Sequence, residues 1–203
     1  RLYMGGNGGF AGTIARSAFA NANQGYVAVS TNTGHDDPSG GARWALNDVE
    51  RQLDYAYVGV HRTVEVAKVL AKAYYGVEPK FSYFNGCSNG GRQGLMEAQR
   101  YPDDFDGYVV GAPGNFQSHS NAGFVWDAQS LSAPNAAIPA AKLPAINAAV
   151  LAACDGNDGL VDGVIANPPT CEFDPAVLLC SGPETNSCLT PAQLGALRKI
   201  YAG

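Results

Sequence analysis

Ser88 is the residue whose surroundings most favour covalent chemistry. It lies at the centre of Gly86-Cys87-Ser88-Asn89-Gly90, which has the G-x-S-x-G spacing of a nucleophile elbow. The run KFSYFNG before it predicts a strand, and GRQGLMEAQRYP after it predicts a short helix that ends near Pro102. Glycines on both sides of such a turn let the neighbouring backbone pass without a β-carbon clash. The pattern predicts that Ser88 is a nucleophile, and a plain Gly-Ser turn is the alternative.

A nucleophile of this kind needs donors for an oxyanion. The helix after the serine would direct its positive end at the site, and the backbone N–H of Asn89 is one predicted donor. The early loop GGNGGFAG predicts the other donor, for which Gly8 and Gly9 are the candidates. A flexible loop or a phosphate loop is the alternative, but no Lys-Ser/Thr pair follows. A dinucleotide loop fits residues 6–11 only in the looser form that ends in Ala, and we expect no organic cofactor.

The general base is harder to find among the histidines, which are His35, His61 and His119. His35 lies in TNTGHDDP, a loop after a strand that could border the site. His61 shares a helical stripe with charged residues, which predicts a partly solvated helix residue. His119 lies in the polar run QSHSN, too soon after a predicted strand for a base. Because α/β-hydrolases place their triad in the order Ser, Asp, His, we expect the catalytic Asp and His beyond Gly203.

The segment CDGNDGLVDGVI carries Asp155, Asp158 and Asp162 within eight residues. Carboxylates this close repel one another unless a positive charge offsets them. Closely spaced oxygen ligands, with glycines that permit tight turns, suit Ca²⁺. The segment is not an EF-hand because the closing Glu is missing. The sequence predicts a structural calcium site, and Asp-Gly turns in a solvated loop are the alternative.

Strands alternate with helices in the first half of the chain. The predicted strands lie in RLYM, GYVAVSTNTG, KFSYFNG and DGYVVGAPG. A helix from about Tyr57 to Tyr75 is predicted by an apolar face that contains Val60, Val64, Ala67, Leu70 and Tyr74. This alternation predicts an α/β fold with a parallel sheet. After about Gly114 the chain is rich in Ala, Asn and Pro, so we place a boundary between a core, 1–114, and an inserted or capping region, 115–203.

Composition excludes several classes of partner. The chain has 203 residues and a net charge of −5, and its lysines and arginines are scattered, so we expect no nucleic-acid partner. No apolar run is long enough to cross a bilayer, so we expect no membrane partner. The chain begins at Arg1, in what reads as the tail of a strand, and no signal peptide is visible. We therefore expect a fragment of a longer protein, and the sequence leaves the oligomeric state open.

The five cysteines are unevenly distributed, with Cys87 alone and four others crowded into the last quarter of the chain. Crowding in a loop-rich stretch predicts disulfides and an oxidising compartment, and therefore a secreted protein, extracellular or periplasmic. A zinc site is the weaker alternative because no CxxC pair occurs.

The run YFNGCSNGGRQGLMEAQRYPDDFDGYVVGAPG resembles the tannase and feruloyl esterase family of α/β-hydrolases. That family also contains fungal type-B feruloyl esterases and a bacterial mono(2-hydroxyethyl) terephthalate hydrolase. The runs GGNGGFAG, TNTGH and CDGNDGLVDGVI match in the same order, so the resemblance covers the whole chain. It implies an α/β-hydrolase core with the start of an inserted lid, and a Ser-His-Asp mechanism that passes through an acyl-enzyme.

The resemblance also implies disulfides and calcium ligands. Cys87 would pair with a downstream Cys next to the catalytic His, which would tie the two ends of the triad together. The pairs Cys154–Cys171 and Cys180–Cys188 would lie in the lid, and pairing of sequence neighbours favours the same two bonds. The calcium ligands would be the three aspartates together with the backbone carbonyls of Leu160 and Val164.

By this resemblance the chain is part of a secreted serine carboxylic ester hydrolase that acts on feruloyl esters, either small molecules or esters linked to polysaccharide. Galloyl esters, the substrates of tannases, are the second candidate, and a terephthalate monoester is the third. A rival of another class is a catalytically incomplete binding module that keeps the hydrolase fold. A downstream reading frame with an Asp and a Cys-His pair would favour the enzyme.

Overall fold

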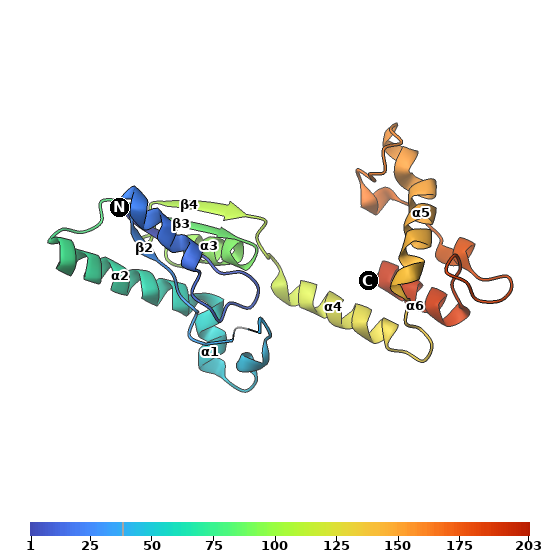
Figure 1. Ribbon diagram of the computed structural model, residues 1–203, viewed down its shortest axis with the longest axis horizontal. Coiled ribbons are helices and arrows are strands. Elements are labelled where there is room, and N and C mark those ends of the chain that lie inside the picture. Colours follow the sequence, from blue (N-terminus) through green and yellow to red (C-terminus); the bar gives the residue numbers. More distant parts are fainter. Residues whose placement is uncertain (38) are drawn as a thin grey trace. The chain divides into compact units, whose positions relative to one another are not determined.

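The computed structural model describes residues 1–37 and 39–203 and divides into two compact units, Arg1–Asn115 and Phe116–Gly203 (Figure 1). Each unit has its own hydrophobic core. Within the described residues, no helix is both long and apolar enough to cross a bilayer.

The first unit contains a parallel sheet with the strand order β2-β1-β3-β4. The strands are β1 (Leu2–Gly5), β2 (Val27–Val29), β3 (Ser82–Cys87) and β4 (Gly107–Gly111). In register, Tyr3 lies opposite Ala28 on one side and Tyr83 on the other. The predicted parallel α/β arrangement is confirmed.

Helices connect these strands. Arg16–Gln24 (η1) and Arg43–Ala45 (η2) are 3-10 turns, and α1 (Val49–Leu53), the π-helical turn η3 (Asp54–Val58) and α2 (Gly59–Tyr75) follow without a break. Helix α3 (Asn89–Arg100) joins β3 to β4. Helix α2 ends at Gly76, whose φ of 75° lets its N–H reach the carbonyl of Lys72. The predicted helix of residues 57–75 is therefore the second part of a longer helical segment.

The core of this unit lies between the sheet and α2 and α3. Its buried residues come from both layers: Leu2, Met4, Val60, Val64, Ala67, Phe84 and Phe105. The predicted apolar face of α2 is wrong at two positions, because Leu70 and Tyr74 are 62% and 82% exposed and Ala71 is buried instead. Leu70 and Tyr74 lie beside β2. Since β2 is an edge strand, nothing in the described chain continues the sheet over these side chains.

The opposite face of the sheet is partly covered by η1. A β-carbon at Gly5 would lie 2.8 Å from Cβ of Ala18, so the turn sits directly on β1. On this face the rings of Tyr3 and Tyr83 lie 6.1 and 6.4 Å from the ring of Tyr26. The described helices therefore lie on both faces of the sheet, as the fold class requires.

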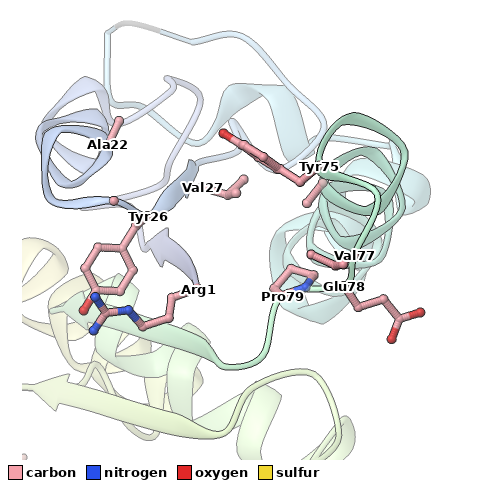
Figure 2. A pocket seen from close by; sticks show the side chains of 10 residues that line it. Arg1, Ala22, Tyr26, Val27, Tyr75, Val77, Glu78 and Pro79 are labelled. Carbon is pink, nitrogen blue, oxygen red and sulfur yellow. The ribbon is translucent and has the colours of Figure 1, made fainter.

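A hollow of about 360 Å³ lies at the amino ends of the strands (Figure 2). Arg1, Tyr26 and Pro79, which line it, precede β1, β2 and β3, and the Arg1 guanidinium lies 4.8 Å from the Tyr26 ring centre. Ser88 directly follows β3 and so lies at the opposite, carboxyl ends of the strands. In parallel α/β sheets ligands bind at the carboxyl ends of the strands, so this hollow is separate from the candidate site.

The second unit is helical. It contains α4 (Gln117–Leu131), α5 (Leu143–Cys154) and α6 (Pro191–Ala202), with 3-10 turns η4 (Ala140–Lys142), η5 (Asp155–Asp158), η6 (Pro168–Thr170) and η7 (Pro175–Leu178). Its core contains Ile146, Leu178, Leu189, Leu194 and Leu197. Helix α6 begins with a capping box between Thr190 and Gln193.

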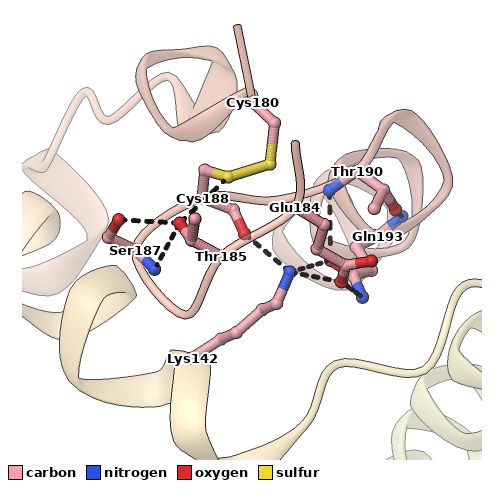
Figure 3. Close-up of a disulfide and its surroundings, with 8 residues drawn as sticks. All are labelled: Lys142, Cys180, Glu184, Thr185, Ser187, Cys188, Thr190 and Gln193. Carbon is pink, nitrogen blue, oxygen red and sulfur yellow. Dashed lines mark hydrogen bonds and ion pairs between the residues drawn. A yellow bond between two sulfur atoms is a disulfide. The ribbon is translucent and has the colours of Figure 1, made fainter. Parts of the chain in front are cut away.

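Both disulfides expected in this region are present, Cys154–Cys171 and Cys180–Cys188. The second closes a loop beside the buried side chain of Lys142 (Figure 3). The Lys142 ammonium donates to Glu184 Oε1 at 2.6 Å, to the Cys188 carbonyl at 2.7 Å and to Gln193 Oε1 at 2.8 Å. All three ammonium protons are thus used, and the loop is fixed to the start of α6.

Candidate active site

Ser88 occupies the sharp turn between β3 and α3. Its φ of 59° and ψ of −119° are strained for a residue with a β-carbon, and its side chain is exposed. The Ser88 N–H donates to the Gly111 carbonyl at 3.0 Å, and the Ser88 carbonyl accepts from Arg92 N–H at 3.0 Å and Gly114 N–H at 3.1 Å. The strained turn is therefore held by backbone bonds from β4, α3 and the loop after β4.

The glycines around the serine are required by close backbone approaches. A β-carbon at Gly86 would overlap the carbonyl group of Gly90, and one at Gly91 would lie 2.5 Å from the Gly111 carbonyl oxygen. A β-carbon at Gly90 would lie 3.2 Å from the carbonyl carbon of Gly6. The first turn of α3 thus packs against both β3 and the glycine loop.

The N–H groups predicted to hold an oxyanion have no acceptor among the described residues. Gly8 and Gly9 are exposed, and no hydrogen bond from their N–H groups occurs in the described part of the chain. The Asn89 N–H is the first of α3 and likewise lacks an acceptor among these residues. The Asn89 side chain is buried, and its Oδ1 accepts from Arg92 Nε at 2.8 Å. The roles of the Gly8, Gly9 and Asn89 N–H groups in catalysis stay predictions.

Two residues that the sequence did not single out support this region. The Arg92 guanidinium donates to the carbonyls of Tyr55 and Ala56, both at 2.9 Å, and lies 4.5 Å from the Tyr55 ring centre. Burial lowers the pKa of Arg92 from its ordinary value. The Tyr55 hydroxyl donates to the Gly9 carbonyl at 3.3 Å. A chain of contacts therefore runs from the residue after Ser88 to the glycine loop.

His35 has a supporting position and not a substrate-facing one. It is 4% exposed, its ring stacks on Trp44 at 3.7 Å, and its Nε2 and Nδ1 lie 2.9 and 3.2 Å from the carbonyl oxygens of Phe10 and Thr33. Each ring nitrogen faces a backbone carbonyl oxygen, and a neutral imidazole donates to one of them, so neither nitrogen is directed at a substrate. Residues 31–37 of this predicted loop do border the glycine loop, through Thr31 beside Asn7 and His35 beside Phe10.

His61 is a partly exposed residue of α2, as its helical stripe predicted, and it also has a partner outside that helix. Its Nδ1 lies 2.6 Å from Asp104 Oδ2, and its ring stacks on Tyr101 at 3.7 Å. Ligand atoms of His61, Glu97 and Asp104 all lie within 4.8 Å of one another, the one such group found in the described residues. His119 is exposed near the start of α4, with its Nδ1 3.5 Å from Ser118 Oγ.

Glu97 is a carboxyl group with an altered titration. Burial and the charge of Asp104 raise the pKa of Glu97 to about 8. The phenol of Tyr108 lies in the same surroundings, and burial together with the charges of Glu97 and Asp104 raises its pKa to about 12. At neutral pH Glu97 is therefore protonated, beside Asp104 and His61.

The aspartates of the predicted calcium site do not converge. Asp155 is buried and accepts from the N–H groups of Asp162 and Gly163 at 3.1–3.3 Å. Asp158 and Asp162 accept from the N–H groups two residues further on, those of Leu160 and Val164. The donor chemistry suits Ca²⁺, but the side chains form turns and not a closed ligand cluster.

Cys87, next to the serine, is an exposed free thiol among the described residues. It is the last residue of β3 and lies beside Gly111 of β4, where a β-carbon would be 3.5 Å from the Cys87 sulfur. Its predicted bond to a downstream cysteine stays a prediction.

Comparison with known proteins agrees with this geometry. A family model described as "Tannase and feruloyl esterase" matches residues 1–203. An uncharacterized esterase of Xanthomonas campestris is 45% identical over 197 residues, which are 96% of this chain and 34% of that protein. Feruloyl esterase B of Aspergillus niger is 37% identical over 207 residues, which cover 100% of this chain and 39% of the esterase.

Among solved structures, feruloyl esterase B from Aspergillus oryzae is similar with a TM-score of 0.79 and 33% identity, over 98% of this chain and 40% of that one. The chain thus spans 34% to 40% of the length of these relatives. The sheet, the serine turn and the glycine loop are those of an α/β-hydrolase, and the chain belongs to the tannase and feruloyl esterase family.

Proposed function

We propose that this chain carries the nucleophile and the oxyanion donors of a serine carboxylic ester hydrolase. The observation that supports this most is the strained, exposed turn at Ser88, bordered by the unpaired N–H group of Asn89 on one side. The glycine loop with Gly8 and Gly9, fixed against the first turn of α3, supplies the second set of unpaired donors. Strain of this kind is typical of reactive sites.

In the proposed reaction, Ser88 Oγ attacks the ester carbonyl carbon while its proton passes to a histidine that an aspartate orients, both beyond Gly203. The carbonyl oxygen becomes an oxyanion held by the N–H groups of Asn89 and of Gly8 or Gly9. The C–O bond then breaks, the alcohol leaves with the proton from the histidine, and an acyl-enzyme remains. Water, deprotonated by the same histidine, attacks the acyl carbon and releases the acid and Ser88.

We further propose a feruloyl ester as substrate and a galloyl ester as the second candidate. The similarity to proteins named feruloyl esterase B supports the first, and the family description, which includes tannase, supports the second. The two disulfides support a secreted, extracellular or periplasmic protein, because such bonds persist in oxidising compartments.

The test is ester hydrolysis by the full-length protein, with methyl ferulate and methyl gallate compared side by side. Ser88→Ala should lower kcat for ester hydrolysis by about 10⁴-fold or more without changing the unfolding curve. Retained turnover in this variant would refute the nucleophile assignment. Preference for gallate would keep the mechanism and change the substrate class.

We also propose a structural Ca²⁺ in the segment 155–164, bound by Asp155, Asp158 and Asp162 with the carbonyls of Leu160 and Val164. The supporting observation is Asp155, which is 7% exposed and forms no ion pair with any described residue. The N–H groups of Asp162 and Gly163 offset part of the cost of burying this carboxylate, and a bound cation would offset more of it. Gly159 and Gly163, with φ of 92° and 83°, allow the tight turns that such a site needs.

A further inference from the structure

We propose that Gln93 is a positioning residue for the hydrolysis proposed above, on which this inference rests. Through two hydrogen bonds to Asn7, Gln93 would hold the glycine loop in register with Ser88. The N–H groups of Gly8 and Gly9 would then keep a fixed distance from the N–H of Asn89. The reason is that α3 carries both Asn89 and Gln93, the residue that holds the loop.

The clamp consists of two bonds from the side-chain amide of Gln93, one to the backbone and one to the side chain of Asn7. The Asn7 N–H donates to Gln93 Oε1 at 3.0 Å, and Gln93 Nε2 donates to Asn7 Oδ1 at 3.3 Å. Asn7 Nδ2 donates to the carbonyls of Thr13 and Thr31 at 2.8 and 2.6 Å. Asn7 is 4% exposed and Gln93 is 2% exposed. Both amides are satisfied in one orientation only, which makes the contact rigid and specific.

The clamp lies where the loop touches the serine turn. A β-carbon at Gly6 would lie 2.7 Å from Cα of Gly90 and 3.0 Å from Gln93 Oε1. Gln93 is on α3, one turn after Asn89, so the two residues face the same side of the helix. Immediately after the clamped Asn7, the chain presents Gly8 and Gly9 with unpaired N–H groups.

The other end of the loop is held by different groups. The Tyr55 hydroxyl donates to the Gly9 carbonyl, and His35 Nε2 lies 2.9 Å from the Phe10 carbonyl. A loop bound at both ends, with free donors between them, is preorganised for an anion. If Gln93 is lost, the near end loses its two bonds to α3 and keeps those from Asn7 Nδ2 to Thr13 and Thr31, while the far end stays bound.

The experiment compares Gln93→Leu and Gln93→Glu in the full-length protein, with Gln99→Leu as the matched control because Gln99 is an exposed residue of the same helix. We expect Gln93→Leu to lower kcat for methyl ferulate roughly 10- to 100-fold and to change KM less than about threefold. Gln99→Leu should stay within about twofold of the wild type. A folded Gln93→Leu with kcat within twofold of the wild type would overturn the proposal.

Gln93→Glu keeps the volume and tests the donor alone. The ionised carboxylate of this variant would accept from the Asn7 N–H but face Asn7 Oδ1 without a proton to donate. The ratio of variant to wild-type kcat should therefore rise as the pH falls from about 8 to about 5, when protonation restores the donor. If Gln93→Leu fails to fold, a flat ratio in Gln93→Glu overturns the proposal.

Amide hydrogen exchange separates this inference from the proposed function, because it needs no turnover. The peptide that covers residues 6–12 should exchange at least about tenfold faster in Gln93→Leu than in the wild type and the Gln99→Leu control. If the wild type hydrolyses no ester, the proposed function fails and exchange alone decides the clamp. Unchanged exchange over residues 6–12 would overturn it.

Discussion

Replacing Glu97 with Gln should remove much of the pH dependence of stability near neutrality. Glu97 is 1% exposed, and neither of its oxygens accepts a hydrogen bond from a described donor. Burial and the neighbouring Asp104 raise its pKa to about 8 from an ordinary value of 4.5. Between these two pH values the folded protein keeps a proton that the unfolded chain has lost.

The sign and size follow from linkage. Because the folded state binds more protons than the unfolded state in this window, the free energy of unfolding falls as the pH rises from about 4.5 to about 8. A difference of 3.5 units (8 − 4.5) at ~1.4 kcal/mol per unit gives at most ~5 kcal/mol. Above pH 8 this carboxyl causes no further loss.

The Glu97→Gln variant carries an amide of nearly the same volume that does not titrate. Urea unfolding of wild type and variant at pH 5, 6.5 and 8 should show the wild type losing a few kcal/mol relative to the variant over this range. Glu50→Gln, which changes an exposed carboxyl, is the control and should follow the wild type. A difference between wild type and Glu97→Gln that stays constant within ~0.5 kcal/mol would refute a protonated Glu97.

Three further predictions concern the turn, the metal and the thiols. Gly86→Ala should destabilise the protein by ~2 kcal/mol or more, because its β-carbon would overlap the Gly90 carbonyl. The control Gly123→Ala, which has open space at its β-carbon, should not destabilise it. Equal unfolding curves for the two variants would contradict this prediction. Chelation should lower the melting temperature, since Ca²⁺ at a free concentration of 100 times its Kd stabilises the folded protein by about 2.7 kcal/mol. An unchanged melting curve in excess chelator, with no metal found by elemental analysis, would exclude the calcium site. Alkylation of the 1–203 chain without reduction should label Cys87 alone, and labelling of four or five thiols would contradict the disulfides.

The sequence predicted the features that are contiguous along the chain. The turn at Ser88 is encoded in five neighbouring residues between a strand and a helix, and the structure has that strand and that helix. The pairing of Asn7 with Gln93 joins residues 86 positions apart, and no periodicity or motif announces it. His61 and Asp104 are 43 positions apart, so the helical stripe that predicted a partly solvated histidine could not predict this partner.

Helix α3 shows why local patterns fail at this kind of site. Hydrophobic periodicity assumes that a helix buries apolar side chains, yet the buried residues of α3 are three glycines and three polar residues: Asn89, Gly90, Gly91, Gln93, Gly94 and Glu97. Leu95 is 41% exposed instead.

Each departure of α3 from the apolar pattern has a geometric reason. Gly90 and Gly91 allow backbone contact with the glycine loop and with β4. Gln93 bonds Asn7, and Glu97 lies beside Asp104. Asn89, Gln93 and Glu97 are spaced four residues apart and share one face, so a single buried stripe fixes the serine turn, the loop and α2. Burying a polar group lowers the stability of the folded state unless the group meets a partner. The position of α3 therefore depends on the distances between its polar residues and their partners more than on the apolar area that it buries.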